Sequence, residues 1–212
     1  MTAGRFLGIL GLYVVILFAI NRCVKEAFGA PLGHAPAKTL YIYGDVDSLN
    51  AAAFNLATTP LLGEPVKLLP SKDVVVSIAT YGGDLDSMNT IIGRIKLLRE
   101  YGYNVRCHAV VAYSAGFMIW MACAERTALA ASQLMFHYPY RVFRGPITYK
   151  DAEEMASDLR PDQEAFHTQL VKDLGMTDAE VKEAAEASRI WSGYALCQKA
   201  KGFCTIVDNI LL

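Results

Sequence analysis

Three features of the sequence supply the residue types that acyl-transfer chemistry needs. Ser114 follows a run of strand-forming residues and opens a helical run, and His137 also follows a predicted strand. A serine that attacks a carbonyl group needs a base to take its proton and N–H donors to hold the oxyanion. Gly82 and Gly83 form a turn after a third strand, where glycine lets backbone N–H groups approach a substrate closely. We therefore predict Ser114 as a nucleophile and His137 as its base.

Each of these signals also has a purely structural explanation. Ser114 can act only as the cap of the helix that follows it. His137 can be a surface residue beside a turn, and a Gly-Gly pair is common in turns. The other histidines are less suitable as a base, because they lie inside a strand, in a linker and on a charged helix: His108, His34 and His167.

Strands and helices alternate from residue 39 to residue 212, which predicts an α/β fold with a mostly parallel sheet. The expected strands are 39–43, 73–78, 105–111, 126–129, 133–136 and 204–207. The expected helices are 49–58, a helix through 88–98 capped by Asp86 or Ser87, 115–124, 150–174 with a kink or break at Pro161, 177–187 and 192–201. Ligands of such sheets bind beyond the carboxyl ends of the strands. The loops 81–84 and 112–116 lie at those ends, so we expect the glycine pair and Ser114 to be neighbours.

The composition limits the classes of protein that the chain can be. Hydrophobic residues make up 53% and charged residues 19% of the 212 positions, and the mean hydropathy is +0.26. Disorder is excluded because there is ample apolar surface to bury. The net charge of −1 argues against a nucleic-acid-binding protein. One long apolar segment is too few for a polytopic membrane protein.

That apolar segment is the uncharged run 6–20, which is flanked by Arg5 and Arg22. A bilayer is usually spanned by about 20 residues, so this run predicts a short membrane anchor within residues 1–29. A cleaved signal segment and a buried helix of the main domain are the alternatives. The flanking charges do not set an orientation. Residues 30–38 are rich in Pro, Gly and Ala and are expected to link this segment to a domain over 39–212.

The five cysteines show no metal-binding spacing, and the glycines form no nucleotide-binding motif. We therefore expect no metal and no other cofactor. Cys107 and Cys123 lie in apolar elements, where buried free thiols are the usual state. If the domain is exported, one pair can oxidise, and Cys197 and Cys204 are the nearest in sequence.

Three segments together resemble the proteolytic subunit of the Clp protease, in the ClpP/crotonase superfamily: YIYGDVD at 41–47, VVVSIATYGGDLDSMNTI at 74–91 and AVVAYSAGFMIWMACAERTALAASQLMFHYPY at 109–140. The glycine pair, the serine and the histidine 23 positions later match in order and spacing. The resemblance covers 39–212 and implies a ClpP/crotonase-like ββα superhelix.

The resemblance further implies a serine endopeptidase. Ser114 would attack the peptide carbonyl, His137 would move the proton, and the N–H groups of Gly83 and Ala115 would hold the oxyanion. The helices over 150–187 would be the handle through which homo-oligomeric rings stack. A peptide or protein is the implied substrate.

Two departures from the family pattern affect this interpretation. The family has a catalytic Asp before an Arg, and here Ser188 precedes Arg189. Glu186 or Asp173 could supply an orienting carboxylate instead, and the sequence does not choose between them. The hydrophobic N-terminus replaces the axial loop that meets the ATP-driven unfoldase, so an unfoldase partner is not predicted.

Two alternative functions follow from the same residues. Membrane peptidases of the signal peptide peptidase A and NfeD types use a Ser–Lys dyad, and YSAGF at 113–117 also resembles their serine motif. Lys150 is the lysine available for such a dyad. The missing Asp suggests the other alternative, a catalytically inactive subunit that builds or anchors a ring.

Overall fold

The computed structural model describes residues 38–63, 72–142 and 145–208. The chain divides into two compact units, Met1–Pro36 and Ala37–Leu212, and all described residues belong to the second. The expected anchor within 1–29 and the linker up to residue 37 lie outside the described residues. Among the helices that the structure describes, none is both long and apolar enough to cross a membrane.

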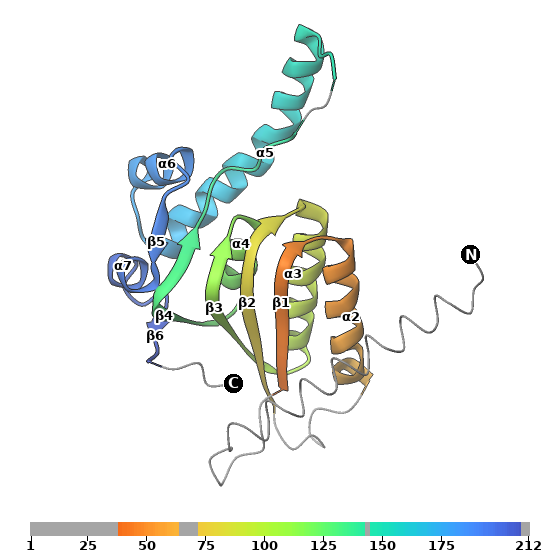
Figure 1. The fold of residues 1–212 in the computed structure, drawn as a ribbon, viewed down its shortest axis with the longest axis vertical. Coiled ribbons are helices and arrows are strands. Elements are labelled where there is room, and N and C mark those ends of the chain that lie inside the picture. Colours follow the sequence, from red (N-terminus) through yellow and green to blue (C-terminus); the bar gives the residue numbers. More distant parts are fainter. Residues whose placement is uncertain (1–37, 64–71, 143–144, 209–212) are drawn as a thin grey trace, which may run out of the picture. The chain divides into compact units, whose positions relative to one another are not determined.

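The centre of the domain is a six-stranded sheet (Figure 1). Its strands are β1 (Lys38–Val46), β2 (Asp73–Gly83), β3 (Asn104–Tyr113), β4 (Glu125–Met135), β5 (Ile190–Ser192) and β6 (Thr205–Ile206). Strands β1 to β4 pair in chain order and are parallel, β6 pairs in parallel with β4, and β5 pairs antiparallel with β4. The mostly parallel sheet confirms the predicted α/β class, whereas β5 was not predicted.

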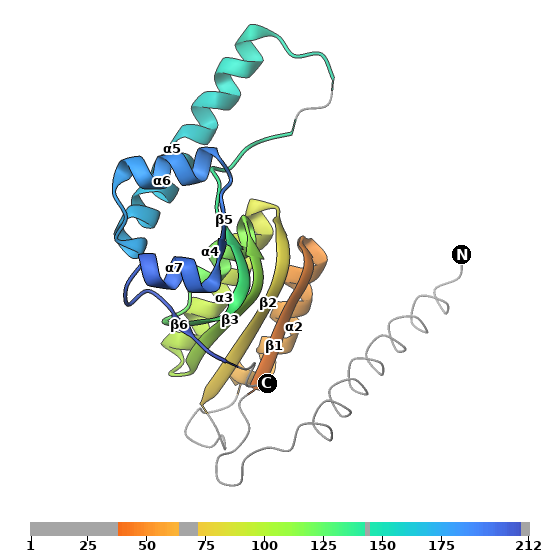
Figure 2. The same ribbon diagram turned by 60° about the vertical axis from the view of Figure 1, so that its left-hand side comes forward.

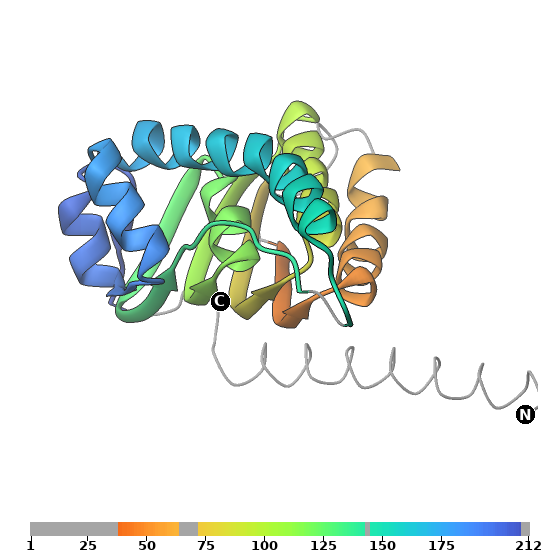
Figure 3. The same ribbon diagram turned by 90° about the horizontal axis from the view of Figure 1, so that it is seen from above.

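Helices α2 (Ser48–Gly63), α3 (Leu85–Glu100) and α4 (Ala115–Met121) cover one face of this sheet (Figure 1). Viewed from above, α2 and α3 lie side by side (Figure 3). Every residue of α4 is buried. Large side chains from α3, α4, β1 and β2 and from the residue that follows β4 fill the core, among them Ile42, Ile78, Ile91, Phe117, Trp120 and Phe136.

The remaining helices are α5 (Tyr149–Leu174), α6 (Asp178–Glu186) and α7 (Gly193–Lys199), on the side of β4 and β5 (Figure 2). Of the kink or break predicted at Pro161, the break is absent, because this proline lies inside one continuous helix. Thr177 and Ser192 cap α6 and α7, since their side chains accept hydrogen bonds from the amides of Glu180 and Ala195. Only Leu170 and Leu174 of α5 are buried, so most of this long helix contacts no core.

Two further expectations are corrected. The strands expected at 126–129 and 133–136 are one strand, β4, whose pairing with β3 shifts between Ala109 and Val111. The cap of α3 is Asp84 rather than Asp86 or Ser87, because its carboxylate accepts the Ser87 amide at 2.8 Å. This hydrogen bond lowers the pKa of Asp84 below its ordinary value.

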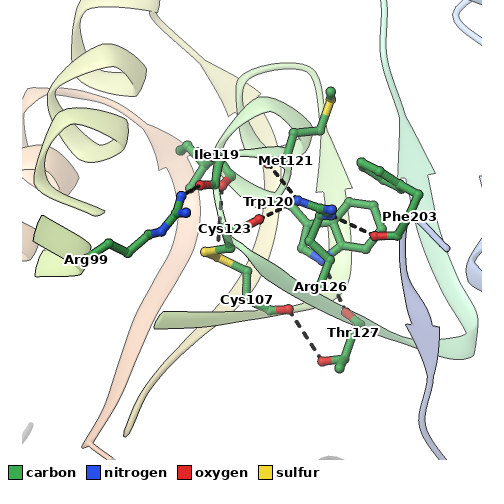
Figure 4. The surroundings of a disulfide bond; sticks show 10 residues. Arg99, Cys107, Ile119, Trp120, Met121, Cys123, Arg126, Thr127 and Phe203 are labelled. Atoms are coloured by element: carbon green, nitrogen blue, oxygen red, sulfur yellow. Dashed lines mark hydrogen bonds between the residues drawn. A yellow bond between two sulfur atoms is a disulfide. The ribbon is translucent and has the colours of Figure 1, made fainter. Parts of the chain in front are cut away.

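Cys107 and Cys123 form a disulfide with an S–S distance of 1.97 Å, so the prediction of free thiols is wrong (Figure 4). The bond joins β3 to the end of the segment that carries α4. Around it, Arg126 donates hydrogen bonds to the Cys123 and Phe203 carbonyls, and its guanidinium lies 4.3 Å from the Phe203 ring centroid. Cys197 and Cys204, the pair suggested by their spacing, form a second disulfide.

Candidate active site

Ser114 connects β3 to α4 with an unusual backbone conformation, φ 53° and ψ −120°. Its amide donates to the Met135 carbonyl at 2.9 Å, which ties it to β4. The side chain makes no capping hydrogen bond, although the residue occupies the cap position of α4. A non-glycine residue in this region costs about 1–3 kcal/mol and persists only where its surroundings hold it. Capping therefore does not account for the serine at this position.

The glycine pair lies directly against this serine. A Cβ atom at Gly82 would lie 2.7 Å from the Ser114 Cβ and 3.2 Å from its Oγ, and Gly82 has φ +107°. Only glycine fits such a position without a shift of the backbone. The tertiary structure thus brings two of the sequence-predicted features together.

The second glycine of the pair, Gly83, lies against β1. The next amide, that of Asp84, donates to the Val46 carbonyl of β1 at 2.8 Å. Gly83 itself is packed tightly, since a Cβ there would lie 2.0 Å from the Val46 oxygen.

Thr80 holds this loop in place, a role that the sequence analysis missed. Its hydroxyl donates to the Gly44 carbonyl and accepts the Gly82 amide at 3.0 Å. Its methyl group lies 2.3 Å from where a Cβ of Gly116 would be, which presses β2 against the start of α4. The signal in the sequence is indirect, because the three glycines next to Thr80 in space are far apart along the chain: Gly44, Gly82 and Gly116.

His137 follows the end of β4 by two residues and is half-buried. Because Tyr113 pairs with Met135, Ser114 and His137 leave the same edge of the sheet from neighbouring parallel strands. The His137 Nδ1 lies 2.7 Å from the Tyr138 carbonyl oxygen. A carbonyl only accepts, so Nδ1 carries the proton and Nε2 keeps a lone pair.

No hydrogen bond joins the Ser114 hydroxyl to His137 in the part of the chain that the structure describes. Hydrogen bonds between catalytic groups are often long in ligand-free enzymes and tighten when substrate binds. The geometry thus places both residues at one edge, with the imidazole in the tautomer that a general base requires.

None of the residues considered for the third position contacts His137 through a hydrogen bond. Ser188 is exposed at the end of α6 with φ 47°, and its amide donates to the Ala185 carbonyl. Asp173 lies near Arg126, where it opposes the lowering of the arginine pKa by burial. Burial and, second, the charge of Glu186 raise the pKa of Tyr138.

A second set of polar groups begins at Tyr138, the residue next to His137, and extends to helices α5 and α6. The Tyr138 hydroxyl is 2.8 Å from His167 Nδ1, and His167 Nε2 is 3.0 Å from the Asp178 carboxylate. From the sequence, His167 is not expected to be a catalytic base, because it lies on a helix with charged neighbours. Its spacing from Tyr138 gave no signal, because only the packing of α5 beside the end of β4 brings them together.

The lysine of the dyad alternative is unsuited to that role. Lys150 has 82% of its side chain exposed and pairs with Glu154 at 3.6 Å. A lysine that acts as a base needs to be desolvated. Within the described ranges, no group of three or more His, Cys, Asp or Glu residues could hold a metal ion.

Comparison with known proteins identifies the family of the chain. No curated protein gave a significant match. The family model of the Clp protease matches residues 64–211, a range that contains the glycine pair, Ser114, His137 and Ser188. Since the match covers more than half of the chain, the protein belongs to the Clp protease family, whose members are serine peptidases.

Proposed function

We propose that this protein is a serine endopeptidase with Ser114 as the nucleophile and His137 as the general base. The observation that carries the proposal is the strained backbone of Ser114, whose hydroxyl caps no helix and lies against the Gly82 backbone. Strain of this kind occurs at functional sites, where it holds a side chain in a required direction.

The proposed reaction assigns one step to each of these groups. The Ser114 Oγ attacks the carbonyl carbon of the scissile peptide while its proton passes to His137 Nε2. The N–H groups of Gly83 and Ala115 stabilise the oxyanion. His137 then donates the proton to the leaving amine, and water releases the acyl group through the same steps.

Membrane attachment and assembly are further parts of the proposal. Residues 6–20 would anchor the chain, and their length and lack of charge support this. Two disulfides support a domain in an oxidising compartment rather than in the cytosol. Members of the family generally form rings that act on peptides, so we propose a homo-oligomeric ring here too.

Labelling of the full chain with a fluorophosphonate tests the nucleophile without knowledge of the substrate. We expect an adduct on Ser114, located by mass spectrometry, and its loss in Ser114→Ala. The control is Ser157→Ala, an exposed serine on α5, which should label normally. An adduct that persists in Ser114→Ala would refute the assignment, and no adduct in the native chain would favour the inactive ring subunit.

The dyad alternative is tested in the same assay. Lys150→Ala removes an exposed side chain that pairs only with Glu154 among the contacts described for it. We expect unchanged labelling of Ser114 in this variant. Loss of labelling with a folded protein would favour the dyad.

A further inference from the structure

Tyr138 is held at both ends, and one of those ends is bonded to His137. Its carbonyl oxygen lies 2.7 Å from His137 Nδ1, and its hydroxyl lies 2.8 Å from His167 Nδ1. The ring also packs against Phe166, with centroids 6.4 Å apart. The residue is therefore fixed between the end of β4 and helix α5.

The hydrogen-bond chain continues into α6. His167 Nε2 lies 3.0 Å from Asp178, whose carboxylate can only accept. Nε2 of the neutral imidazole therefore carries the proton, and Nδ1 accepts the Tyr138 hydroxyl. Each donor in the series has one acceptor, and the series ends on a charge in solvent, because the Asp178 side chain is 86% exposed.

We propose that the Tyr138 carbonyl takes the place of the missing carboxylate and that Tyr138, His167 and Asp178 are positioning residues for His137. This inference rests on the proposed function. Residues 136–142 belong to no helix or strand, so β-ladder bonds do not fix the Tyr138 carbonyl. The hydroxyl at the far end of the same residue supplies that fixation through His167.

A carboxylate in a triad fixes the tautomer of the histidine and stabilises the imidazolium, and the carbonyl can do the first of these fully and the second only in part. It selects the tautomer in which Nε2 has a free lone pair, as the third member of a triad does. It carries no full negative charge, so it stabilises the imidazolium formed during the reaction less well. Ser188 then has no catalytic role. This agrees with its exposed position and with the absence of a hydrogen bond between Ser188 and His137 among the described residues.

The test uses two variants that leave His137 and the backbone carbonyl in place. Tyr138→Phe removes only the hydroxyl, and His167→Ala removes its partner. In each, the maximal rate of fluorophosphonate labelling of Ser114 should fall about 10-fold, a fraction of the 10²–10⁴-fold that general base catalysis supplies. The inhibitor concentration for half-maximal rate should not change. The control Tyr149→Phe, at an exposed tyrosine, should label normally.

The double variant sharpens this test. Because both groups act through one chain, the double variant should label no more slowly than either single variant. Tyr138→Phe decides the matter if His167→Ala fails to fold.

A spectroscopic measurement keeps the inference separate from the proposed function. A two-bond ¹H–¹⁵N spectrum of histidine-labelled chain reports the tautomer of His137, which His137→Ala identifies. We expect the Nδ1–H form in the native protein and a mixture of tautomers in Tyr138→Phe. A native Nε2–H form, or a tautomer and a labelling rate that neither variant changes, would overturn the inference. If native Ser114 is never labelled, the proposed function fails while the tautomers still decide the positioning.

Discussion

At the scale of single residues, the site depends on two backbone conformations that ordinary side chains avoid. Ser114 has φ 53° and Gly82 has φ +107°, and the two residues are in contact. The strain at Ser114 is held by the Met135 carbonyl on one side and by the buried helix α4 on the other. The glycine is required because the serine occupies the space that a Cβ would need.

Gly82→Ala should therefore damage the active site more than the fold. The new Cβ would lie 2.7 Å from the Ser114 Cβ, so the loop that carries the Gly83 amide must move. We expect labelling of Ser114 to slow by about 100-fold, since loss of one oxyanion donor costs about 10²–10³-fold. The matched control is Gly93→Ala in α3, where nothing lies within 4 Å and the helix should gain stability. Labelling of Gly82→Ala at the native rate would contradict this account.

His108 gives the stability of the domain a dependence on pH. It is buried, its Nδ1 lies 3.0 Å from the Thr127 hydroxyl oxygen, and its Nε2 has no partner among the described residues. Burial lowers the pKa of this imidazole below its ordinary value. The unfolded chain, with a pKa near 6.5, binds the proton first as the pH falls. The free energy of unfolding should therefore fall as the pH drops below about 6.5.

Urea unfolding at pH 7.5 and pH 5.5 tests this effect in the native chain and in His108→Gln. The native protein should lose more stability between the two pH values, because the variant lacks the group that titrates. The other charged residues that line the same cavity as His108 are Arg106, Glu125 and Arg126, and His108→Gln leaves all three in place. Equal losses in the two proteins would remove His108 as the cause.

The sequence predicted those residues of the candidate site that directly follow strands. It did not predict the contacts that depend on how helices and strands pack together. Ser114, His137 and the glycine pair each end a strand-forming run, so their order along the chain predicted their edge of the sheet. The Tyr138 carbonyl left no signal, because any residue has one. The family pattern directed attention to the side chain of Ser188, because such a pattern describes side chains and not backbone carbonyls.

At the scale of elements, a side chain in β4 makes hydrogen bonds where the regular backbone pairing with β3 is interrupted. Two short strands, 126–129 and 133–136, were predicted, with residues 130–132 between them. The structure bridges this interruption with Ser132, whose hydroxyl accepts the Leu129 amide at 2.9 Å and donates to the Ala109 carbonyl at 2.6 Å. Sequence patterns report strands but not the tertiary hydrogen bonds that join them.

Ser132→Ala should destabilise the domain through these two backbone groups. Ser132 is buried, and its loss leaves a donor and an acceptor unpaired, which costs about 1–3 kcal/mol. Chemical denaturation should show this decrease in the free energy of unfolding. Ser157→Ala on the exposed face of α5 should have almost no effect, and equal stability of the two variants would contradict the role of Ser132.

The Cys107–Cys123 disulfide is the other feature of the elements that the sequence did not predict. Whether Cys107 meets Cys123 depends on how α4 returns to β3, a distance set by tertiary packing. The bond closes 16 residues and the Cys197–Cys204 bond closes 7, so chain entropy predicts contributions of roughly 3 and 2 kcal/mol. Protein that is unfolded, reduced and refolded under reducing conditions should melt at a lower temperature than the oxidised protein. Identical melting temperatures would show that the bonds contribute nothing to stability.

At the scale of the whole molecule, the low proportion of charge has two physical sources. Most of β2 and all of α4 are buried and therefore require apolar residues on all sides. The described domain also leaves large hydrophobic side chains exposed. Among the exposed side chains are Tyr41, Tyr43, Leu49, Leu56, Tyr140, Val142 and Tyr149. In a monomer these side chains stay in water and contribute no free energy of burial, whereas a contact with a second subunit would bury them.

The exposed side of α2 carries two leucines that a contact with a second copy of the chain would bury. Leu49 and Leu56 are 76% and 73% exposed and are seven residues apart, so they lie on one side of the helix. Burial of each against a second copy would contribute about 1.5–3 kcal/mol, and a charge at either position would oppose the contact. We expect the double variant Leu49→Glu/Leu56→Glu to have a smaller mass by light scattering than the native full chain. Lys201→Glu, which makes the same two-unit charge change on an exposed residue beyond α7, should keep the native mass. Equal masses for all three proteins would exclude this face of α2 from the assembly.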